Sequence, residues 1–191
     1  MGNEVIRLAG IAGSLRRASY SRMVLETLAE QLPLTVSLIP HPLDEVPLYN
    51  GDLDTATPPP GVHALRQAIG GSDGIVVVTP EYNHGIPGVL KNALDWASRP
   101  GFASVLVDKP ALMVSVSPGA VGGARAQTQL RETLAGAAAR VIARRQIAIG
   151  NIDQKISGER LVDRTTIDFA LQGIQDLLME IRRECAFRAL A

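Results

Sequence analysis

The sequence predicts an α/β protein built as a three-layer sandwich, with a five-stranded parallel sheet of strand order 2-1-3-4-5. Three observations support this prediction. Five apolar, β-branched runs alternate with helical patterns along the 191 residues. The runs, such as IVVV at 75–78, show no polar alternation, which is typical of strands buried on both faces. Right-handed crossovers leave few topologies, and this order is the usual one at this size.

Strands and helices are expected to alternate from one end of the chain to the other. The first helix begins near Tyr20, because Tyr20, Val24 and Leu28 recur at intervals of four residues and share one face. Pro87 suits the first turn of the third helix. Strands are expected at residues 5–13, 34–40, 74–80, 110–117 and 140–150, and helices at 20–32, 62–69, 87–97, 121–139 and 163–188.

Length and composition indicate a single domain over residues 1–191, because 46% hydrophobic residues suffice for a sizeable core. The 19 basic residues balance 19 acidic ones, so no nucleic-acid partner is expected. No apolar run approaches the ~18 residues of a membrane-spanning helix. The N-terminus lacks the pattern of a secretory signal. We therefore expect a cytoplasmic protein that contacts no membrane.

Cysteine and histidine usage excludes most thiol and metal chemistry. Cys185 is the only cysteine, which excludes an internal disulfide and a cysteine-ligated iron–sulfur cluster. It falls in the last helical pattern, where a buried thiol with no part in turnover is expected. The three histidines, His41, His63 and His84, are widely separated and show no ligand spacing. No metal site is predicted.

The segment after the third strand is crowded with special residues. TPEYNHGIPGVLK at 79–91 places Pro80, Glu81, Tyr82 and Asn83 in a row, where a plain connection needs one turn residue and a cap. In this topology the switch point lies between strands 1 and 3, and ligands bind beyond the strand carboxyl ends there. The segment is therefore predicted to form part of a ligand site. Ordinary packing of Tyr82 is the alternative.

The loop after the first strand, GIAGSLRRASYSR at 10–22, predicts a phosphate site. Hydroxyls, free backbone N–H groups and a guanidinium at a helix N-terminus suit an anion. The sequence has neither GxxxxGK[ST] nor GxGxxG, so two common phosphate loops are excluded. The alternative is a serine-rich turn with a Ser19 helix cap and solvated arginines. The candidates in this loop are Ser14, Arg16, Ser19, Tyr20 and Ser21.

The loop after the fourth strand, SVSPGAVGGARAQ at 115–127, is rich in glycine. Ser117 and Gly119 end the strand, and Gly122 and Gly123 are expected to open the next helix. Two adjacent glycines there cost roughly 1 kcal/mol each relative to alanine. Close approach of a flat ligand to the backbone would explain that cost. A flexible turn is the alternative.

All three loops should lie on one edge of the sheet, where together they suit a mononucleotide with a large planar group. With these motifs the chain resembles the NAD(P)H-dependent FMN reductase family, which includes quinone, chromate and azo-dye reductases. PEYN followed by GxxKNALDW is the most specific part of the likeness, which runs from Val5 to about Gly150. The resemblance implies a flavodoxin-like fold, bound FMN and a homodimer or homotetramer.

The resemblance also implies roles for the candidate residues. Ser14, Arg16, Ser19 and Ser21 would hold the FMN phosphate. The isoalloxazine would be lined by Pro80, Glu81, Tyr82 and Asn83, and approached on its other side by Ser117, Gly122 and Gly123. The family often has Asn where this chain has Ser21. His84 and Gly85 stand at positions that vary among members.

The expected reaction is ping-pong hydride transfer from NAD(P)H through flavin to quinones, azo dyes, chromate or free flavin. No side chain is assigned as an obligate acid or base. A flavodoxin-like electron carrier without NAD(P)H oxidation is the alternative, and a flavin-free protein of the same fold is another. Candidates for a contact with the NADPH 2′-phosphate are Arg17, Arg99 and Arg125. The long loop at 41–60 suggests a functional or interface role.

Overall fold

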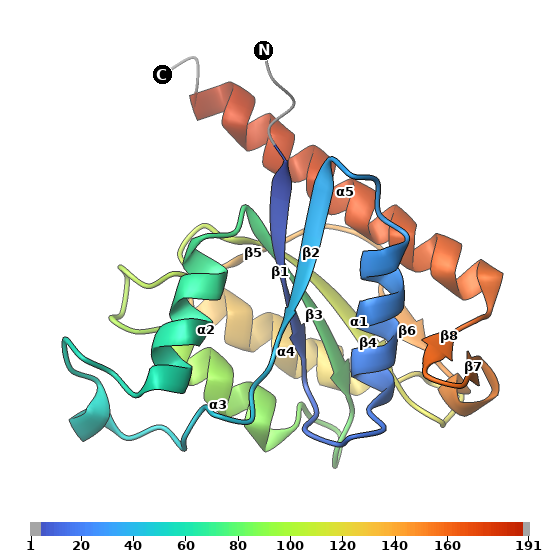
Figure 1. The fold of residues 1–191 in the computed structure, drawn as a ribbon, viewed down its shortest axis with the longest axis horizontal. Coiled ribbons are helices and arrows are strands. Elements are labelled where there is room, and N and C mark those ends of the chain that lie inside the picture. The colour runs from blue at the N-terminus through green and yellow to red at the C-terminus, as the bar shows by residue number, and fades with distance from the viewer. Residues whose placement is uncertain (1–4, 189–191) are drawn as a thin grey trace.

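The computed structural model describes residues 5–188 and confirms the predicted sheet (Figure 1). Its strands are parallel and follow the order β2-β1-β3-β4-β5. Ala12 at the end of β1 pairs with Val78, and Pro80 at the end of β3 pairs with Val116. The strands that position the site are β1 (Ile6–Ala12), β2 (Val36–His41), β3 (Gly74–Pro80) and β4 (Pro110–Val116).

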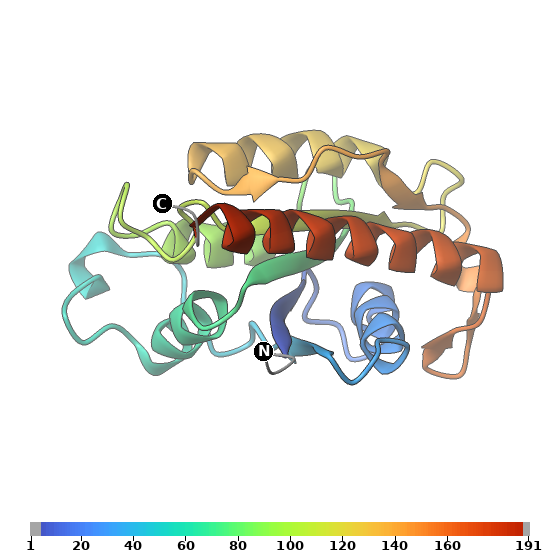
Figure 2. The ribbon, with the colours of Figure 1, turned by 90° about the horizontal axis from the view of Figure 1, so that it is seen from above.

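The helices cover the sheet on both faces (Figure 2). Alternate residues of β3 divide between the layers: Val76 and Val78 pack beneath α1 and α5, while Ile75 and Val77 pack beneath the other three helices. This division explains the unbroken apolar run, because neither face of the strand meets water. The helices are α1 (Tyr20–Glu30), α2 (Pro60–Gly70), α3 (Gly88–Ala97), α4 (Ala124–Gly136) and α5 (Arg164–Arg188).

The fifth strand differs from the prediction, because residues 140–150 do not form one strand. They form β5 (Arg140–Val141) and β6 (Ile147–Ile149), both paired with β4. Between them Arg144 leaves the sheet: its Nη1 donates to Asp176 Oδ2 on α5 at 2.8 Å, and it lies over the Phe169 ring. The hydrogen bond from Arg144 lowers the pKa of Asp176 below its ordinary value.

A hairpin near the C-terminal end, which the sequence pattern did not indicate, braces α1. It consists of β7 (Ile156–Ser157) and β8 (Arg160–Leu161) and follows the short 3-10 helix η2 (Ile152–Gln154). The Arg160 guanidinium donates hydrogen bonds to both Glu30 carboxylate oxygens, at 3.0 and 2.7 Å. The backbone N–H of Leu161 donates to the buried hydroxyl of Thr27 at 3.1 Å.

The long segment after β2 is fixed to the neighbouring helices. It contains the 3-10 helix η1 (Gly51–Leu53). The Trp96 Nε1 and Asn92 Nδ2 atoms of α3 both donate to the Pro47 carbonyl at 2.8 Å, and Tyr49 N–H donates to Asn92 Oδ1 at 2.7 Å. Trp96 is fully buried and belongs to the core.

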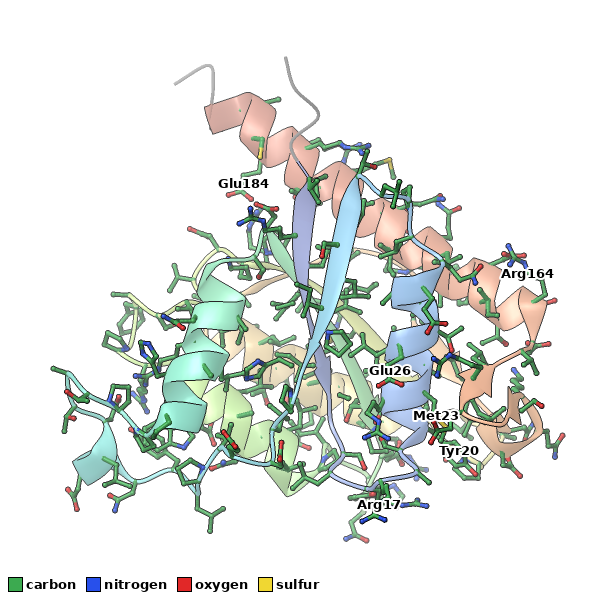
Figure 3. The ribbon with its side chains drawn as sticks, in the orientation of Figure 1. Arg17, Tyr20, Met23, Glu26, Arg164 and Glu184 are labelled. Carbon is green, nitrogen blue, oxygen red and sulfur yellow. The ribbon has the colours of Figure 1, made fainter. Side chains whose placement is uncertain are left out.

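The expectation of a buried Cys185 is wrong, because its side chain is exposed. It lies near the end of α5, whose neighbouring Glu184 is at the opposite end of the molecule from Arg17 in Figure 3. There it lines a hollow of about 520 Å³ with Gly70, Asp73 and Lys109 among others. The amphipathic pattern identified the helix, but that helix extends beyond the sheet it covers.

Neither a membrane span nor a metal centre is visible in the part of the chain that the structure describes. Within residues 5–188 no helix combines the length and apolar character needed to cross a membrane. Over the same residues no group of three or more His, Cys, Asp or Glu side chains is arranged to hold a metal ion.

Thr27→Val should destabilise the protein by about 1–3 kcal/mol, because it leaves the buried Leu161 N–H without an acceptor. Urea unfolding measures the change. Thr133→Val is the matched control. Its hydroxyl donates to the Gln129 carbonyl at 2.8 Å, as that of Thr27 donates to the Met23 carbonyl at 2.8 Å, but it accepts no hydrogen bond from a second element within residues 5–188. Its expected cost is below about 0.5 kcal/mol. Equal effects of the two substitutions would contradict a bracing role for the hairpin.

Candidate functional site

The three predicted loops converge at a shallow hollow of about 80 Å³ on the carboxyl edge of the sheet. They converge because β1, β3 and β4 are adjacent and parallel, so their ends meet at one edge. Nine of the predicted residues line the hollow, namely Ser14, Arg16, Ser19, Tyr20, Ser21, Pro80, Glu81, Tyr82 and Ser117. The other four lie in the same loops but not on its wall: Asn83, Gly119, Gly122 and Gly123.

The start of α1 presents backbone N–H groups rather than hydroxyls. Ser19 caps the helix by accepting from Arg22 N at 3.3 Å, and its Oγ lies 2.9 Å from that of Ser21. Both serines are buried, so these hydroxyls are committed to each other and to the helix. The N–H groups of Tyr20 and Ser21 meet no acceptor within residues 5–188. Such free N–H groups and the helix dipole favour an anion.

Two further polar groups complete this end of the hollow. Ser14 Oγ accepts from the backbone N–H of Arg16 at 3.3 Å, which folds the loop back on itself. No carboxylate among the described residues pairs with the Arg16 guanidinium. An uncompensated guanidinium beside free N–H groups gives a site for one phosphate.

The segment after β3 forms a tight turn that explains its crowding. Tyr82 and Gly85 exchange two backbone hydrogen bonds of 3.0 Å, and the two residues between them, Asn83 and His84, have φ of 51° and 66°. These values match a type I′ turn. A Cβ at Gly85 would lie 2.3 Å from Gln129 Oε1, so a side chain there would displace Gln129, which accepts from the Ile86 N–H at 2.7 Å. The turn leaves Tyr82 at the hollow with 49% of its surface exposed, which rules out ordinary core packing.

Glu81 joins this turn to α4. Its Oε2 accepts from the backbone N–H groups of Arg125 at 3.1 Å and Ala126 at 3.3 Å. The N-cap residue of α4 is Gly123, which has no side chain to offer, so Glu81 supplies the missing cap from a neighbouring loop. His84 Nδ1 lies 3.9 Å from Glu81 Oε1 and contacts the Arg125 guanidinium.

The two adjacent glycines precede α4 and are not part of it, so they do not lower the stability of the helix as expected. Gly122 and Gly123 have φ of 68° and 74°, in the left-handed region. A Cβ on Gly122 would lie 2.6 Å from the carbonyl carbon of Ala148. Glycine is therefore required at position 122 by backbone conformation and by packing against β6.

Sequence reasoning missed a buried polar pair behind this turn. Ser115 Oγ donates to the Gly122 carbonyl at 2.7 Å, and Gln127 Nε2 donates to Ser115 Oγ at 2.9 Å and to the Ile147 carbonyl at 2.8 Å. Both side chains are almost fully buried. A polar residue inside the apolar run PALMVSV was the available signal, because a buried hydroxyl needs a partner.

The loops after β3 and β4 together form an open surface, which we call the shelf, beside the anion site before α1. A parallel sheet of this order with these two features is typical of mononucleotide-binding proteins of the flavodoxin-like class. A variant of flavodoxin from Pseudomonas aeruginosa shares the fold alone, with TM-score 0.53 at 12% identity over 93% of this chain and 97% of the other. The family model described as NADPH-dependent FMN reductase matches residues 6–154. The chain belongs to that family, and the resemblance is confirmed.

Relatives and solved structures agree with this assignment. The chain is 35% identical over 182 residues to an NAD(P)H-dependent FMN reductase from Pseudomonas aeruginosa strain PAO1, covering 95% of this chain and 98% of the relative. It is 42% identical over 132 residues to a quinone reductase from Pseudomonas putida strain KT2440, covering 69% and 71%. The flavoenzyme NAD(P)H:(acceptor) oxidoreductase FerB from Paracoccus denitrificans superposes with TM-score 0.84 at 28% identity, over 94% and 98%.

The protein is accordingly an FMN-dependent oxidoreductase with NAD(P)H as co-substrate, and the alternative of a simple electron carrier is disfavoured. The residues at the hollow fit this cofactor. Free N–H groups on Tyr20 and Ser21, beside the Arg16 guanidinium, match a single terminal phosphate. The half-exposed Tyr82 and the shelf near Ser117 leave a planar ring room along the surface.

Glu81→Ala should destabilise the protein by about 0.5–2 kcal/mol, because α4 loses the acceptor at its N-terminus. Urea unfolding of the protein without cofactor isolates this contribution. Glu132→Ala, on an exposed face of the same helix, is the control for loss of one negative charge. Unchanged stability of the Glu81 variant would show that the carboxylate does not fix the turn to α4.

Proposed function

We propose that the protein is a quinone reductase that oxidises NAD(P)H and reduces its acceptor on the same open shelf, by ping-pong hydride transfer. The observation that carries the proposal is the convergence of an anion site and an open shelf in a chain of the FMN reductase family. Relatives named as quinone reductases, and a 2-hydroxy-1,4-benzoquinone reductase from Burkholderia 44% identical over 126 residues, favour a quinone as acceptor. Azo dyes, chromate and free flavin are secondary acceptors, and the cytoplasm is the proposed location.

The β1–α1 loop is proposed to bind the FMN phosphate. Arg16 and Ser14 would contact it with side chains, whereas Tyr20 and Ser21 would donate backbone N–H groups. Ser19 would act by holding the helix start in place. This assignment keeps every residue predicted for the phosphate site. It differs in that backbone N–H groups, and not the hydroxyls of Ser19 and Ser21, would contact the phosphate.

The β3 and β4 loops are proposed to hold the ring. Its neighbours would be Pro80, Glu81, Tyr82 and Asn83 on one side and Ser117, Gly119, Gly122 and Gly123 on the other. When bound, FMN supplies a ring nitrogen that accepts a hydride and returns electrons to a second substrate. The chain contributes position: the strained turn fixes Tyr82, and Glu81 fixes the turn to α4. None of these side chains is required as an obligate acid or base.

Two measurements test the proposed function. Flavin released from the purified protein should be FMN, one per chain, since the loop offers a single phosphate site. The loaded protein should oxidise NAD(P)H with a quinone present. Release of FAD as the main flavin, or bound FMN without NAD(P)H oxidation, would contradict the proposal, the latter in favour of an electron carrier.

Arg16→Ala should raise the FMN dissociation constant about 10- to 150-fold, because a hydrogen bond to a charged group contributes roughly 1.5–3 kcal/mol. Fluorescence quenching measures the affinity. Turnover at saturating FMN should change little, since the phosphate is remote from the reacting ring atom. Arg17→Ala is the control and should leave FMN affinity unchanged, because Arg17 does not line the hollow. Equal FMN affinity of wild type and Arg16→Ala would show that the phosphate site is misassigned.

A homodimer or homotetramer is also proposed. A hollow of about 80 Å³ cannot enclose a flavin ring, so a neighbouring subunit would supply further walls. Leu48 and Phe102, in the loops after β2 and after α3, are 84% and 99% exposed. Exposed apolar side chains of this size are typical of an interface. The small residues of segment 134–139 give little further support for an interface, because Leu134 and Ala139 are buried in the chain's own core.

Light scattering should give at least a dimer mass, and Leu48→Asp should shift the protein toward monomer. Leu34→Asp is the control, because Leu34 is fully exposed but lies in the connection between α1 and β2, at the opposite edge of the sheet. A monomer mass for active, FMN-loaded protein would refute the proposal.

A further inference from the structure

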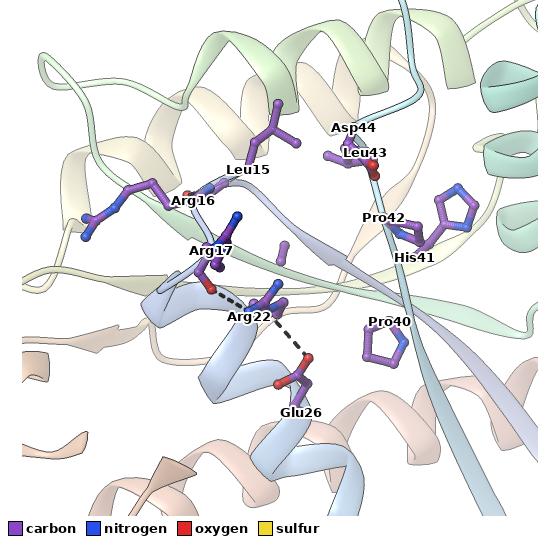
Figure 4. Close-up of a pocket in the computed structure, with 12 residues that line it drawn as sticks. Leu15, Arg16, Arg17, Arg22, Glu26, Pro40, His41, Pro42, Leu43 and Asp44 are labelled. Atoms are coloured by element: carbon purple, nitrogen blue, oxygen red, sulfur yellow. Dashed lines mark hydrogen bonds and ion pairs between the residues drawn. The ribbon is translucent and has the colours of Figure 1, made fainter. Parts of the chain in front are cut away.

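A second and larger cavity lies behind the phosphate loop (Figure 4). Its volume is about 440 Å³, within the range of small-molecule sites. It opens between the β1–α1 loop, the first turns of α1 and the segment that follows β2. Nothing in the FMN site accounts for it, because the two cavities share only Ser14 and Arg16.

The consecutive arginines of the loop divide between the two cavities. Arg16 lines both, whereas Arg17 lines only the larger one. In Figure 4 the Arg16 side chain extends away from Arg17 and Arg22, which lie close together. One face of the β1–α1 loop therefore presents Arg16 to the FMN site, and the other face presents Arg17 to the larger cavity.

Arg17 is the uncommitted positive charge of the larger cavity. Arg22 is already engaged: it donates to the Arg17 carbonyl, and its Nε lies 3.6 Å from Glu26 Oε1. Glu26 is further balanced by Arg160 at 3.9 Å. Within residues 5–188 the Arg17 guanidinium has no acidic partner, although its backbone is held by Arg22. An anion that binds Arg17 would displace no ion pair.

The rest of the wall suits a flat, uncharged group. Leu15, Pro40 and Pro42 give apolar surface, and Leu15 is 57% exposed. Burial lowers the pKa of His41, despite the nearby Asp44, and so favours the neutral imidazole. Apolar surface and a neutral imidazole favour a purine, while the carboxylate of Asp44 confines a phosphate to the Arg17 side.

We propose that this cavity binds the 2′-phosphorylated adenosine of NADPH, with Arg17 pairing with the 2′-phosphate, so that the protein prefers NADPH to NADH. The inference rests on the proposed function, since it assigns the co-substrate of that reaction. A dinucleotide seated here would cross the loop at Ser14 and Arg16, which form the common wall of the two cavities.

The test uses FMN-loaded protein with 2′,5′-ADP and 5′-AMP as probes, measured by titration calorimetry. Wild type should bind 2′,5′-ADP more tightly. Arg17→Ala should weaken 2′,5′-ADP binding about 10- to 100-fold, leave 5′-AMP binding unchanged and leave FMN affinity unchanged. Arg17→Lys should restore part of the loss. Arg182→Ala, an exposed arginine of α5 at a distance from both cavities, is the control for lost charge.

Kinetics with a neutral quinone separate the co-substrate from an anionic acceptor. The ratio of kcat/KM for NADPH to that for NADH should fall by the same factor in Arg17→Ala, through KM. Binding of 2′,5′-ADP that is insensitive to Arg17, or equal use of both nicotinamides by wild type, would overturn this inference alone. Failure to oxidise either nicotinamide would instead overturn the proposed function. Competition by inorganic phosphate as strong as by 2′,5′-ADP would show a simple anion site and also overturn the inference.

Discussion

The position of every functional loop depends on the burial of β3 between two helical layers. Val76 and Val78 face one layer and Ile75 and Val77 the other, so a shift of the strand by one residue would move every side chain into the wrong layer. That fixed register places the end of β3 level with the ends of β1 and β4. Three loops of different chemistry therefore meet at one edge, held there by the backbone hydrogen bonds of the parallel sheet and by the packing of both its faces.

The β1–α1 loop shows how a short segment serves two purposes. The buried hydroxyls of Ser19 and Ser21 hold the start of α1, which leaves the first backbone N–H groups free to meet an anion. Because these groups are fixed before any ligand arrives, little ordering remains to oppose binding. The same rigidity fixes the outer face of the loop, where Arg22 holds the carbonyl of Arg17 and leaves its guanidinium free.

The β3 and β4 loops gain their rigidity from each other. Asn83 and His84 occupy the left-handed region, which costs more for histidine than for asparagine or glycine. Glu81 compensates by giving α4 the cap that Gly123 cannot supply. Positive φ at Gly122 and the buried bond from Ser115 hold the other side. The shelf formed by these two loops is thus a braced structure with an open face.

The sequence by itself determined the layers, the strand order and the three loops that meet at the candidate site, and it raised the Ser19 cap in the alternative interpretation of the first of these loops. These follow from hydrophobic period and local backbone chemistry, which act over a few residues. Only the tertiary structure decided which distant groups meet. Nothing in RVIARRQIAIG indicates that Arg144 interrupts the strand and pairs with Asp176 on α5. Likewise, nothing in the residues around Glu81 indicates that its carboxylate caps a helix more than forty residues later. The exposure of Cys185 and the cavity between Arg17 and Pro40 also depend on the tertiary structure. Such pairings are set when packed layers bring side chains together, and no local preference encodes that distance.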